Sequence, residues 1–238
     1  MKRGKKYRNI IKDVDKNKLY SPLEALKLVK KISKANFDET VEVAIRLGVD
    51  TKKAEQQVRG TLILPHGTGK IPRVLVFAKG EKAADAKKKR AEIVGGEELA
   101  EKIKGGFLDF DVVIATPDMM SIIGKLGKIL GPRGLMPNPK LGTVTLEVSK
   151  AVEDAKKGKV EYRADKHGII HLVLGKASFS VKKLVENYAL LIEEIVRVKP
   201  SAAKGKYLKS IRFSSTMGPS VAVDTTKIRN LFEDELEV

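Results

Sequence analysis

The clearest pattern in the chain is an alternation of apolar and polar side chains between Val41 and Val49. The apolar side chains of this segment share one face, while Glu42 and Arg46 fall on the other. This alternation predicts a strand in a sheet that is covered on a single side, which is typical of α+β folds. A second alternation, over residues 206–213, predicts another strand, and the Ser, Thr, Gly and Pro residues of 214–219 predict a loop after it.

Helical spacing and a turn motif predict the elements around these strands. The segment 21–24 (SPLE) has the form of a capping box with proline at the first helical position, and apolar residues then recur at helical spacing to Ser33. Residues 181–198 predict a long amphipathic helix. Two strand-like segments, 160–164 and 169–174, flank the sequence Asp-Lys-His-Gly and predict an antiparallel hairpin.

The middle of the chain has a different character. Residues 74–78 and 112–115 are apolar runs without alternation, as expected of strands that are buried on both faces. Segments with helical character lie between and after them, at 81–90, 97–104, 118–129 and 147–157. Asp118 is expected to cap the third of these helices. Strands and helices that alternate at this spacing predict a Rossmann-like, three-layer α/β arrangement around a mainly parallel sheet.

The simplest assembly of these elements has two domains. Residues 1–67 and 160–238 form a discontinuous α+β domain, and residues 68–159 form an α/β domain that is inserted into it. Proline and glycine are dense at residues 65–69, where the chain would pass between the domains. Two neighbouring connections of this kind predict a hinge. The expected hinge residues are Gly67, Thr68, Gly69, Gly158 and Lys159.

The chain is strongly basic. It carries 47 lysines and arginines against 30 aspartates and glutamates, which gives a net charge of +17 and a pI near 9.8. This excess favours a polyanionic partner, nucleic acid before membrane, over a surface of balanced ion pairs. The sequence contains no cysteine, no signal peptide and no apolar run of about 18 residues. We therefore expect a cytoplasmic protein with no membrane partner.

No residue pattern predicts an active site. The segment 66–70 (HGTGK) resembles part of a phosphate loop, but isoleucine follows where that pattern needs Ser or Thr. His167 and His171 lie across the predicted hairpin, where they would not face one zinc ion as a helical pair does. Asp109 and Asp111 flank a phenylalanine before a strand and favour a turn over a catalytic pair. We therefore expect neither enzymatic activity nor a metal or cofactor.

Four separated motifs lie along the chain. The longest covers residues 125–140, and its three prolines between 131 and 140 exclude regular structure there. The others are VRG with LPHG in residues 58–67, GKASF in residues 175–179 and STMG in residues 215–218. Together they resemble the bacterial large-subunit ribosomal protein L1 family, and the resemblance covers essentially the whole chain in the same order.

The resemblance implies the two-domain architecture described above, with the main RNA surface on the discontinuous domain. It implies binding to the stalk region of 23S rRNA, in a mobile stalk that assists the release of deacylated tRNA from the exit site. It also implies repression of translation through the protein's own operon mRNA, and a monomer off the ribosome. With the basic N-terminal arm, the expected RNA-binding residues are Arg3, Lys5, Phe37, Thr40, Glu42, Asp165, Lys166, His167, Lys176, Ser210, Thr216, Met217 and Gly218.

The physical mechanism that follows is recognition of folded RNA by its shape. Basic residues of the segment 3–12 and of the first long helix supply a salt-dependent attraction. The hydroxyls of Ser210 and Thr216 and the backbone of Gly218 then hydrogen-bond riboses. Glycine at position 218 would let RNA approach the backbone closely.

Several alternatives remain open on the sequence alone. Phe37 either packs on RNA or covers the sheet, and core packing is favoured somewhat for Met217. Asn36 and Ala164 depart from the family's pattern, and each departure removes one implied RNA contact. A nucleotide-using enzyme in the inserted domain and a general nucleic-acid chaperone are the competing functions; nucleotide-dependent stabilisation favours the first, and indifference to RNA structure favours the second.

Overall fold

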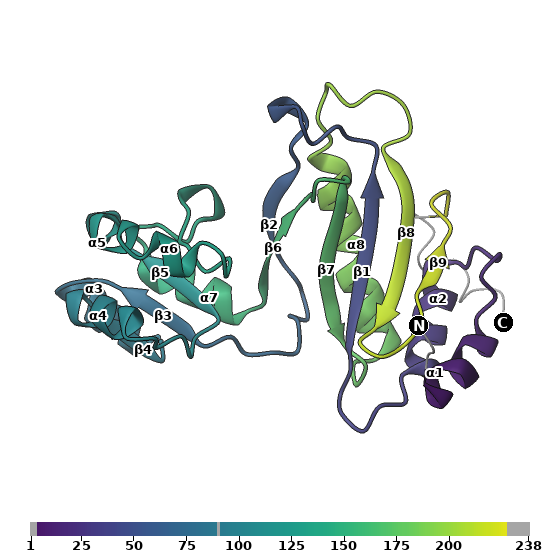
Figure 1. The fold of residues 1–238 in the computed structure, drawn as a ribbon, viewed down its shortest axis with the longest axis horizontal. Coiled ribbons are helices and arrows are strands. Elements are labelled where there is room, and N and C mark those ends of the chain that lie inside the picture. Colours follow the sequence, from purple (N-terminus) through teal and green to yellow (C-terminus); the bar gives the residue numbers. More distant parts are fainter. Residues whose placement is uncertain (1–3, 90, 228–238) are drawn as a thin grey trace. The chain divides into compact units, whose positions relative to one another are not determined.

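The computed structural model describes residues 4–89 and 91–227. It contains helices together with several sheets, so the predicted mixed class of helices and strands is confirmed (Figure 1). The chain divides into two compact units. The first consists of Met1–Gly69 and Val160–Val238, and the second of Lys70–Lys159.

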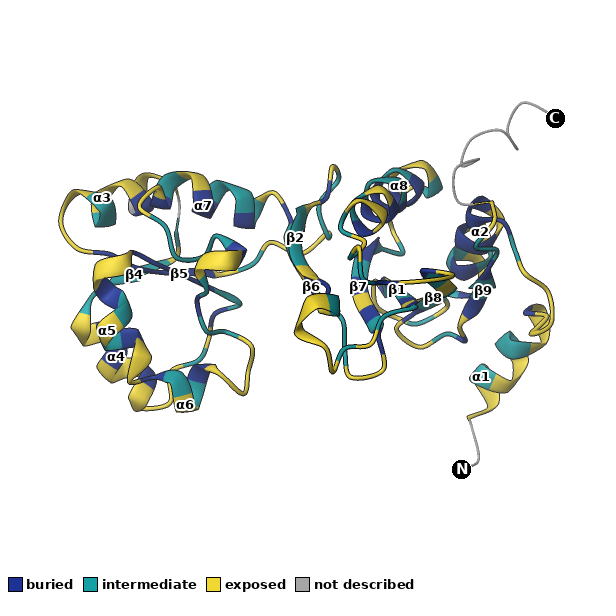
Figure 2. Cartoon of the chain, turned by 90° about the horizontal axis from the view of Figure 1, so that it is seen from above, coloured by how far each residue is buried: buried dark blue, intermediate teal, exposed yellow. Residues whose placement is uncertain are grey.

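A four-stranded antiparallel sheet forms the centre of the first unit, with its strands in the order β7-β1-β8-β9. These strands are β1 (Thr40–Leu47), β7 (Ile169–Lys176), β8 (Leu208–Ser215) and β9 (Val221–Val223). Two helices, α2 (Pro22–Ile32) and α8 (Val181–Arg197), cover one face of the sheet (Figure 2). The predicted single-sided sheet is therefore confirmed.

The core between helices and sheet follows directly from the alternation of the strands. Val41, Val43 and Ile45 are buried, whereas the residues between them are not. Tyr188 of α8 meets Phe213 of β8 edge to face, with ring centroids 4.9 Å apart. Aromatic contacts of this geometry stabilise a core beyond the area they bury.

Local sequence determines where the helices of this unit begin. The Ser21 hydroxyl accepts a hydrogen bond from the Glu24 N–H, and the Glu24 carboxylate accepts one from the Ser21 N–H, so the predicted capping box is confirmed. At α8 only the hydroxyl half of this motif is present: Ser180 Oγ accepts the Lys183 N–H. The basic N-terminal arm contains helix α1 (Lys5–Ile10) and a 3₁₀ turn (Ile11–Asp13), neither of which has buried residues.

The predicted hairpin of residues 160–174 is wrong. Strand β6 (Lys159–Arg163) pairs with β2 (Arg59–Ile63) in a two-stranded sheet, whereas β7 pairs with β1. The turn between β6 and β7 does form, since the Asp165 N–H donates to the Ile169 carbonyl and the Gly168 N–H to the Asp165 carbonyl. Each strand then finds a distant partner, which the local pattern cannot reveal. A 3₁₀ turn (Ala54–Gln56) precedes β2.

The second unit contains a three-stranded parallel sheet in the order β4-β3-β5. Its strands are β3 (Val74–Phe77), β4 (Ile93–Gly95) and β5 (Val112–Ala115). Its helices are α3 (Glu81–Lys88), α4 (Glu97–Lys104), α5 (Met120–Gly124), α6 (Gly127–Leu130) and α7 (Val148–Lys156). One hydrophobic cluster joins the sheet to α3 and α7, and another joins it to α4, α5 and α6 (Figure 2).

The continuous helix expected over residues 118–129 is wrong. A 3₁₀ turn (Pro117–Met119) precedes α5, α5 ends at Gly124, and α6 begins only at Gly127. Asp118 lies inside the 3₁₀ turn and does not cap a helix. Glycine is a poor helix former, so two glycines three residues apart favour a break. A last 3₁₀ turn (Pro139–Leu141) lies in the proline-rich segment.

Candidate nucleic-acid interface

The side of the large sheet that faces away from α2 and α8 carries polar and charged side chains. Glu42 and Arg46 of β1 are exposed on it. His171 of β7 and Arg212 of β8 lie on either side of Ala44 in the strand register, and both are exposed. This open face therefore has a largely basic centre, and the sequence-predicted residues lie along it and at its two ends.

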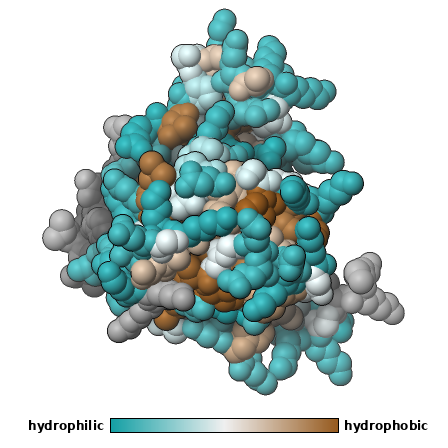
Figure 3. All heavy atoms as spheres, turned by 90° about the vertical axis from the view of Figure 1, so that its left-hand side faces the viewer, coloured by the Kyte–Doolittle hydropathy of each residue, from teal (hydrophilic) through white to brown (hydrophobic). Residues whose placement is uncertain are grey.

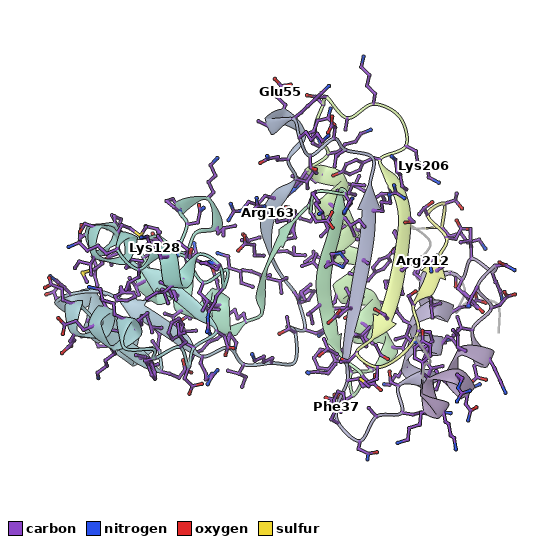
Figure 4. The ribbon with its side chains drawn as sticks, viewed as in Figure 1. Phe37, Glu55, Lys128, Arg163, Lys206 and Arg212 are labelled. Atoms are coloured by element: carbon purple, nitrogen blue, oxygen red, sulfur yellow. The ribbon has the colours of Figure 1, made fainter. Side chains whose placement is uncertain are left out.

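At one end of the open face, two large apolar side chains point into solvent. Phe37 is 53% exposed and Met217 is 61% exposed. Phe37 lies just before β1, at the lower end of the sheet in Figure 4. Met217 follows β8, whose last residue, Ser215, pairs with Val41 near the start of β1. The alternative that either residue belongs to the core is therefore wrong, and both remain available for contact with a partner.

One buried carboxylate holds the two segments that carry these side chains. Glu39 is only 2% exposed, and it lies between Phe37 and β1. Its Oε1 accepts the Ala35 N–H at 3.0 Å, and its Oε2 accepts the Met217 N–H at 3.0 Å. Glu39 therefore ties the backbone at Ala35, just before Phe37, to the backbone of Met217.

The electrostatics of Glu39 agree with this role. Burial alone would raise the pKa of the carboxyl, but the N–H donors of Met217, Ala35 and Lys34 lower it further than burial raises it. The net result is a pKa below its ordinary value of 4.5. The carboxylate is thus charged in the folded protein at neutral pH, as hydrogen bonds to an anion require.

A second network joins Thr40, Thr216 and Lys176 at the same end. The Thr216 hydroxyl accepts the Thr40 N–H at 2.9 Å and donates to the Thr40 carbonyl at 3.4 Å. Lys176 donates from Nζ to the Thr40 hydroxyl at 2.9 Å. The Thr216 side chain thus continues the pairing of β8 with β1 past the end of the strand, and one lone pair of its oxygen is left for a ribose hydroxyl.

The loop expected over residues 214–219 begins later than predicted. Strand β8 runs to Ser215, and Ser214 pairs with Glu42 in the register. Ser215 is buried, so only Thr216 and the residues after it form the turn. The pairing with β1 overrides the local preference of consecutive serines for a turn.

We expect Thr216→Val to lower the free energy of unfolding by about 1 kcal/mol, because valine keeps the shape but loses both hydrogen bonds to Thr40. Urea unfolding of the variant measures this loss. Thr61→Val is the matched control, since Thr61 lies in β2 and its hydroxyl makes no hydrogen bond within the described residues. Equal stabilities of the two variants would contradict the pairing role of Thr216.

Gly218 has a reason for being glycine that the sequence did not suggest. A Cβ at this position would lie 2.5 Å from Oγ of Ser215 and 3.8 Å from Cδ1 of Ile32. The missing side chain would therefore point into the protein and not toward a partner. The glycine lets the turn pack closely on the end of β8, and that packing positions Met217.

A groove of about 890 Å³ extends this end of the sheet toward the N-terminal helix. Phe37, Met217 and Glu39 line one part of it, and Lys6 and Tyr7 of α1 line another. Lys5 begins α1 and is exposed. Helix α1 thus brings lysines beside the exposed apolar pair, while Arg3 lies outside the described residues.

The other end of the open face holds the turn at residues 165–168. The Asp165 carboxylate accepts the backbone N–H groups of Ile169 and His167, both at 2.8 Å, and these bonds lower its pKa below the ordinary value of 3.8. Asp165 thus closes the turn, and Lys166 and His167 are exposed on it. Strand β1 has eight residues, so the two ends lie roughly 25 Å apart. Ser210, opposite Arg46, lies toward this second end.

The residues expected at the hinge have unusual backbone conformations. Gly67, Gly69 and Gly158 have φ values of 65°, 76° and 96°, which only glycine adopts without strain. The side-chain amide of Asn187, which is fully buried, donates to the Gly67 carbonyl at 3.1 Å. Gly67 is therefore anchored on α8.

The two aspartates considered as a catalytic pair have structural partners. Asp111 accepts hydrogen bonds from Lys70 Nζ at 2.7 Å and from the Arg73 backbone at 3.1 Å, and the Lys70 contact holds its pKa well below the ordinary value. Asp109 pairs with Arg73. Within the described part of the chain, no group of three or more His, Asp or Glu side chains is placed to hold a metal ion.

Sequence reasoning missed several residues of this surface. Arg46, His171 and Arg212 were assigned no RNA contact, although the alternation of their strands places all three on the open face. Glu39 was missed because its partners, Ala35 and Met217, are far apart in the sequence. Alternation in β8 was the available signal for Arg212; nothing local indicated Glu39.

A basic, single-sided sheet with an exposed aromatic and an exposed thioether side chain at one end has the features of an RNA-binding surface. The chain belongs to the ribosomal protein L1p/L10e family, whose model matches residues 29–219. It is therefore a ribosomal protein and not an enzyme, as the sequence predicted. Among the described helices, none combines the length and apolar character that crossing a bilayer requires.

Curated relatives match the chain over nearly its full length. A protein of Acidothermus cellulolyticus is 57% identical over 235 residues, which cover 99% of this chain and 98% of the relative. One of Thermobifida fusca is 58% identical over 229 residues, covering 96% and 97%, respectively. One of Frankia alni is 56% identical over 236 residues, covering 99% of each. All three are named large ribosomal subunit protein uL1.

Proposed function

We propose that this chain is a structural rRNA-binding protein of the large ribosomal subunit in the cytoplasm. The observation that carries the proposal is the pair of exposed side chains, Phe37 and Met217, on backbone that the buried Glu39 carboxylate fixes. Side chains that are apolar, exposed and held in place suit stacking on unpaired bases and packing on sugars. The names of the relatives support the same assignment.

Recognition would combine charge with a fixed shape. The lysines of α1, together with Lys176, Arg46 and Arg212, would attract phosphates and bring RNA to the open face. Phe37 and Met217 would then contact bases, while Thr216 accepts a bond from a ribose hydroxyl. A folded RNA that matches both ends of the sheet would gain contacts that a plain duplex does not.

A finer assignment follows the family resemblance. The target would be the stalk region of 23S rRNA, and the protein would form the mobile stalk that assists release of deacylated tRNA. A hinge at residues 67–69 and 158–159 would serve that movement. The protein would also repress its own operon by binding a similar structure in the mRNA, and it would be a monomer off the ribosome.

The test compares binding of the purified chain to a folded rRNA stalk fragment and to a plain RNA duplex of equal length. Both titrations are run at low and at physiological salt. We expect a preference for the folded fragment that persists at physiological salt, because shape-specific contacts are less salt-dependent than phosphate contacts.

Two other results would each point to a competing function. Equal binding to both RNAs that collapses with salt would indicate a general nucleic-acid chaperone and would contradict the proposal. Thermal stabilisation by a nucleotide, without RNA preference, would indicate a nucleotide-using second unit. A fragment of the operon mRNA, titrated under the same conditions, tests the regulatory role separately.

A further inference from the structure

The groove beside helix α1 exposes apolar side chains on the surface of the first unit. Phe37 and Met217 are more than half exposed, and Tyr7 and Ile10 of α1 line the same groove, whose volume is about 890 Å³. Helix α1 itself has no buried residue. A groove of this size can take a peptide segment, and contiguous exposed apolar side chains are typical of an interaction site. We call it the α1 groove.

The surroundings of the α1 groove are basic. Residues 4–13 carry four bases and one acid, which are Lys5, Lys6, Arg8, Lys12 and Asp13. Lys34, which follows α2, lines the groove as well. None of these five cations forms an ion pair with a described residue. Of the two acids that line the groove, Glu39 is buried on backbone N–H donors, so only Asp13 is exposed.

One segment of the sequence has the complementary composition. Residues 228–238 (IRNLFEDELEV) lie outside the described residues. They carry four acids and one base, and all four acids fall within residues 233–237. Their apolar residues recur at the spacing of one helical face, namely Ile228, Leu231, Phe232 and Leu236. We call residues 228–238 the acidic tail; it combines apolar residues with negative charge, as the groove combines apolar residues with positive charge.

The acidic tail begins within reach of the α1 groove. The Asp224 N–H, just after β9, donates to the Tyr20 carbonyl at 2.9 Å, beside the start of α2. The groove extends to Ile32 at the end of α2, roughly 18 Å from Tyr20 at 1.5 Å per residue. Residues 225–232 span up to about 26 Å when extended. Since α1, α2 and β9 also lie at the same side of the unit (Figures 1 and 2), the apolar residues of the tail can reach the groove.

We propose that the acidic tail docks in the α1 groove of its own chain and competes there with RNA. Leu231 and Phe232 cover Phe37 and Met217, and the acids that follow them lie beside the lysines of α1. A tethered segment acts at an effective concentration on the order of millimolar, so modest contacts hold it. The docking rests on the groove and the tail alone, whereas the competition also rests on the proposed RNA-binding role of Phe37 and Met217.

Tethering and cover both favour this occupant. The tail of a second chain reaches the groove only at the concentration of the protein in solution, which is far below that of a tethered segment. On the face shown in Figure 3, hydrophobic side chains form only small separate patches among hydrophilic ones. That face therefore offers an apolar segment less continuous cover than the α1 groove does.

The first experiment follows docking in the free protein. The chain contains no tryptophan, so Phe232→Trp introduces a single fluorescent reporter in the tail. We expect acrylamide to quench it severalfold less in the full chain than in a synthetic peptide of residues 225–238 with the same substitution. The variant K6E/K34E should raise the quenching to that of the peptide. The control K52E/K53E, which changes two exposed lysines outside the groove, should leave it unchanged.

The second experiment measures the competition. The variant E233Q/E235Q is compared with E55Q/E193Q, which removes two exposed carboxylates elsewhere in the first unit. If the tail occupies the groove in about nine of ten molecules, the apparent RNA affinity falls about tenfold, since only the open fraction binds. We expect E233Q/E235Q to bind the folded rRNA fragment at least threefold more tightly than the parent, and E55Q/E193Q to change the affinity less than twofold. The fragment should also restore full quenching of the Phe232→Trp reporter.

Other results would overturn the inference. Quenching as strong in the chain as in the peptide would exclude docking, and quenching that falls as the protein concentration rises would assign the tail to a second chain. Equal affinities of the two glutamine variants, or a reporter that stays protected while the fragment binds, would exclude the competition. A fragment that fails to bind the parent chain would count against the proposed function, while protection of the reporter in the free protein would still establish the docking.

Discussion

The double variant Phe37→Ala with Met217→Ala is expected to bind the folded rRNA fragment roughly 30- to 100-fold more weakly than the unchanged chain. Stacking of one base on an aromatic side chain contributes about 1–3 kcal/mol, and the methionine adds packing on a neighbouring base or sugar. Both side chains are more than half exposed, so their removal leaves no cavity in the core. The melting temperature should therefore stay within about a degree or two of the parent value.

A matched control is available within the same unit. Leu19 is 60% exposed in the segment before α2, and Val196 is 42% exposed on α8, which covers the opposite face of the sheet. Leu19→Ala with Val196→Ala removes similar exposed apolar area, yet it should leave RNA affinity unchanged. If both double variants lose affinity equally, the loss reflects general surface change, and the contact role of Phe37 and Met217 must be abandoned.

The elements that the sequence predicted well are those whose secondary structure is determined by residues close together in the sequence. The alternation from Val41 onward predicted β1 and its buried face, because a strand in a half-covered sheet must alternate. Ser21 and Glu24 predicted the start of α2, since both partners of a capping box lie within one turn. In both cases, the residues that determine the element lie within a few positions of one another, so the sequence is enough to predict it.

Two of the elements that were predicted wrongly depend on distant partners. The segment that became β6 pairs with β2, about one hundred residues earlier in the chain, whereas the sequence was interpreted as pairing it with the adjacent β7. Ser214 and Ser215 join a strand because β1 provides ladder bonds for them. Their local preference for a turn is weaker than a full set of backbone hydrogen bonds.

The candidate site also combines residues that the sequence predicted with an interaction between distant residues that it did not. Phe37, Thr216 and Met217 came from a family resemblance, and the structure places them together at one end of the sheet. The resemblance gave no physical reason why their positions should be fixed. That reason is Glu39, whose carboxylate accepts the backbone N–H groups of both Ala35 and Met217. The sequence alone does not show that these two distant residues share one acceptor.

Glu39→Gln is therefore expected to lower both stability and specific RNA affinity. Each carboxylate oxygen accepts a backbone N–H, so the NH₂ group of glutamine must face one of these donors in either orientation. A buried N–H left without an acceptor costs about 1–3 kcal/mol, which urea unfolding will measure. The released segments at Phe37 and Met217 should weaken binding of the folded fragment by about tenfold, since 1.4 kcal/mol of lost positioning corresponds to that factor.

The sign of the affinity change distinguishes positioning from simple charge. Removing a negative charge should strengthen RNA binding if only electrostatics matter. Glu55→Gln is the matched control, because Glu55 is exposed on a 3₁₀ turn of the same unit and loses the same charge. We expect Glu55→Gln to bind the fragment equally or slightly more tightly, and Glu39→Gln to bind it more weakly. Tighter binding by both variants would exclude a positioning role for Glu39.

The pH dependence of stability provides an independent measurement. The pKa of Glu39 in the folded protein lies below its ordinary value of 4.5, so the stabilisation is complete above that pH and is lost as the pH falls through the folded-state pKa. The difference in unfolding free energy between the parent and Glu39→Gln should thus be constant near neutral pH and shrink below about pH 4.5. A difference that stays constant on acidification would mean that the charge of Glu39 does not hold the two segments together.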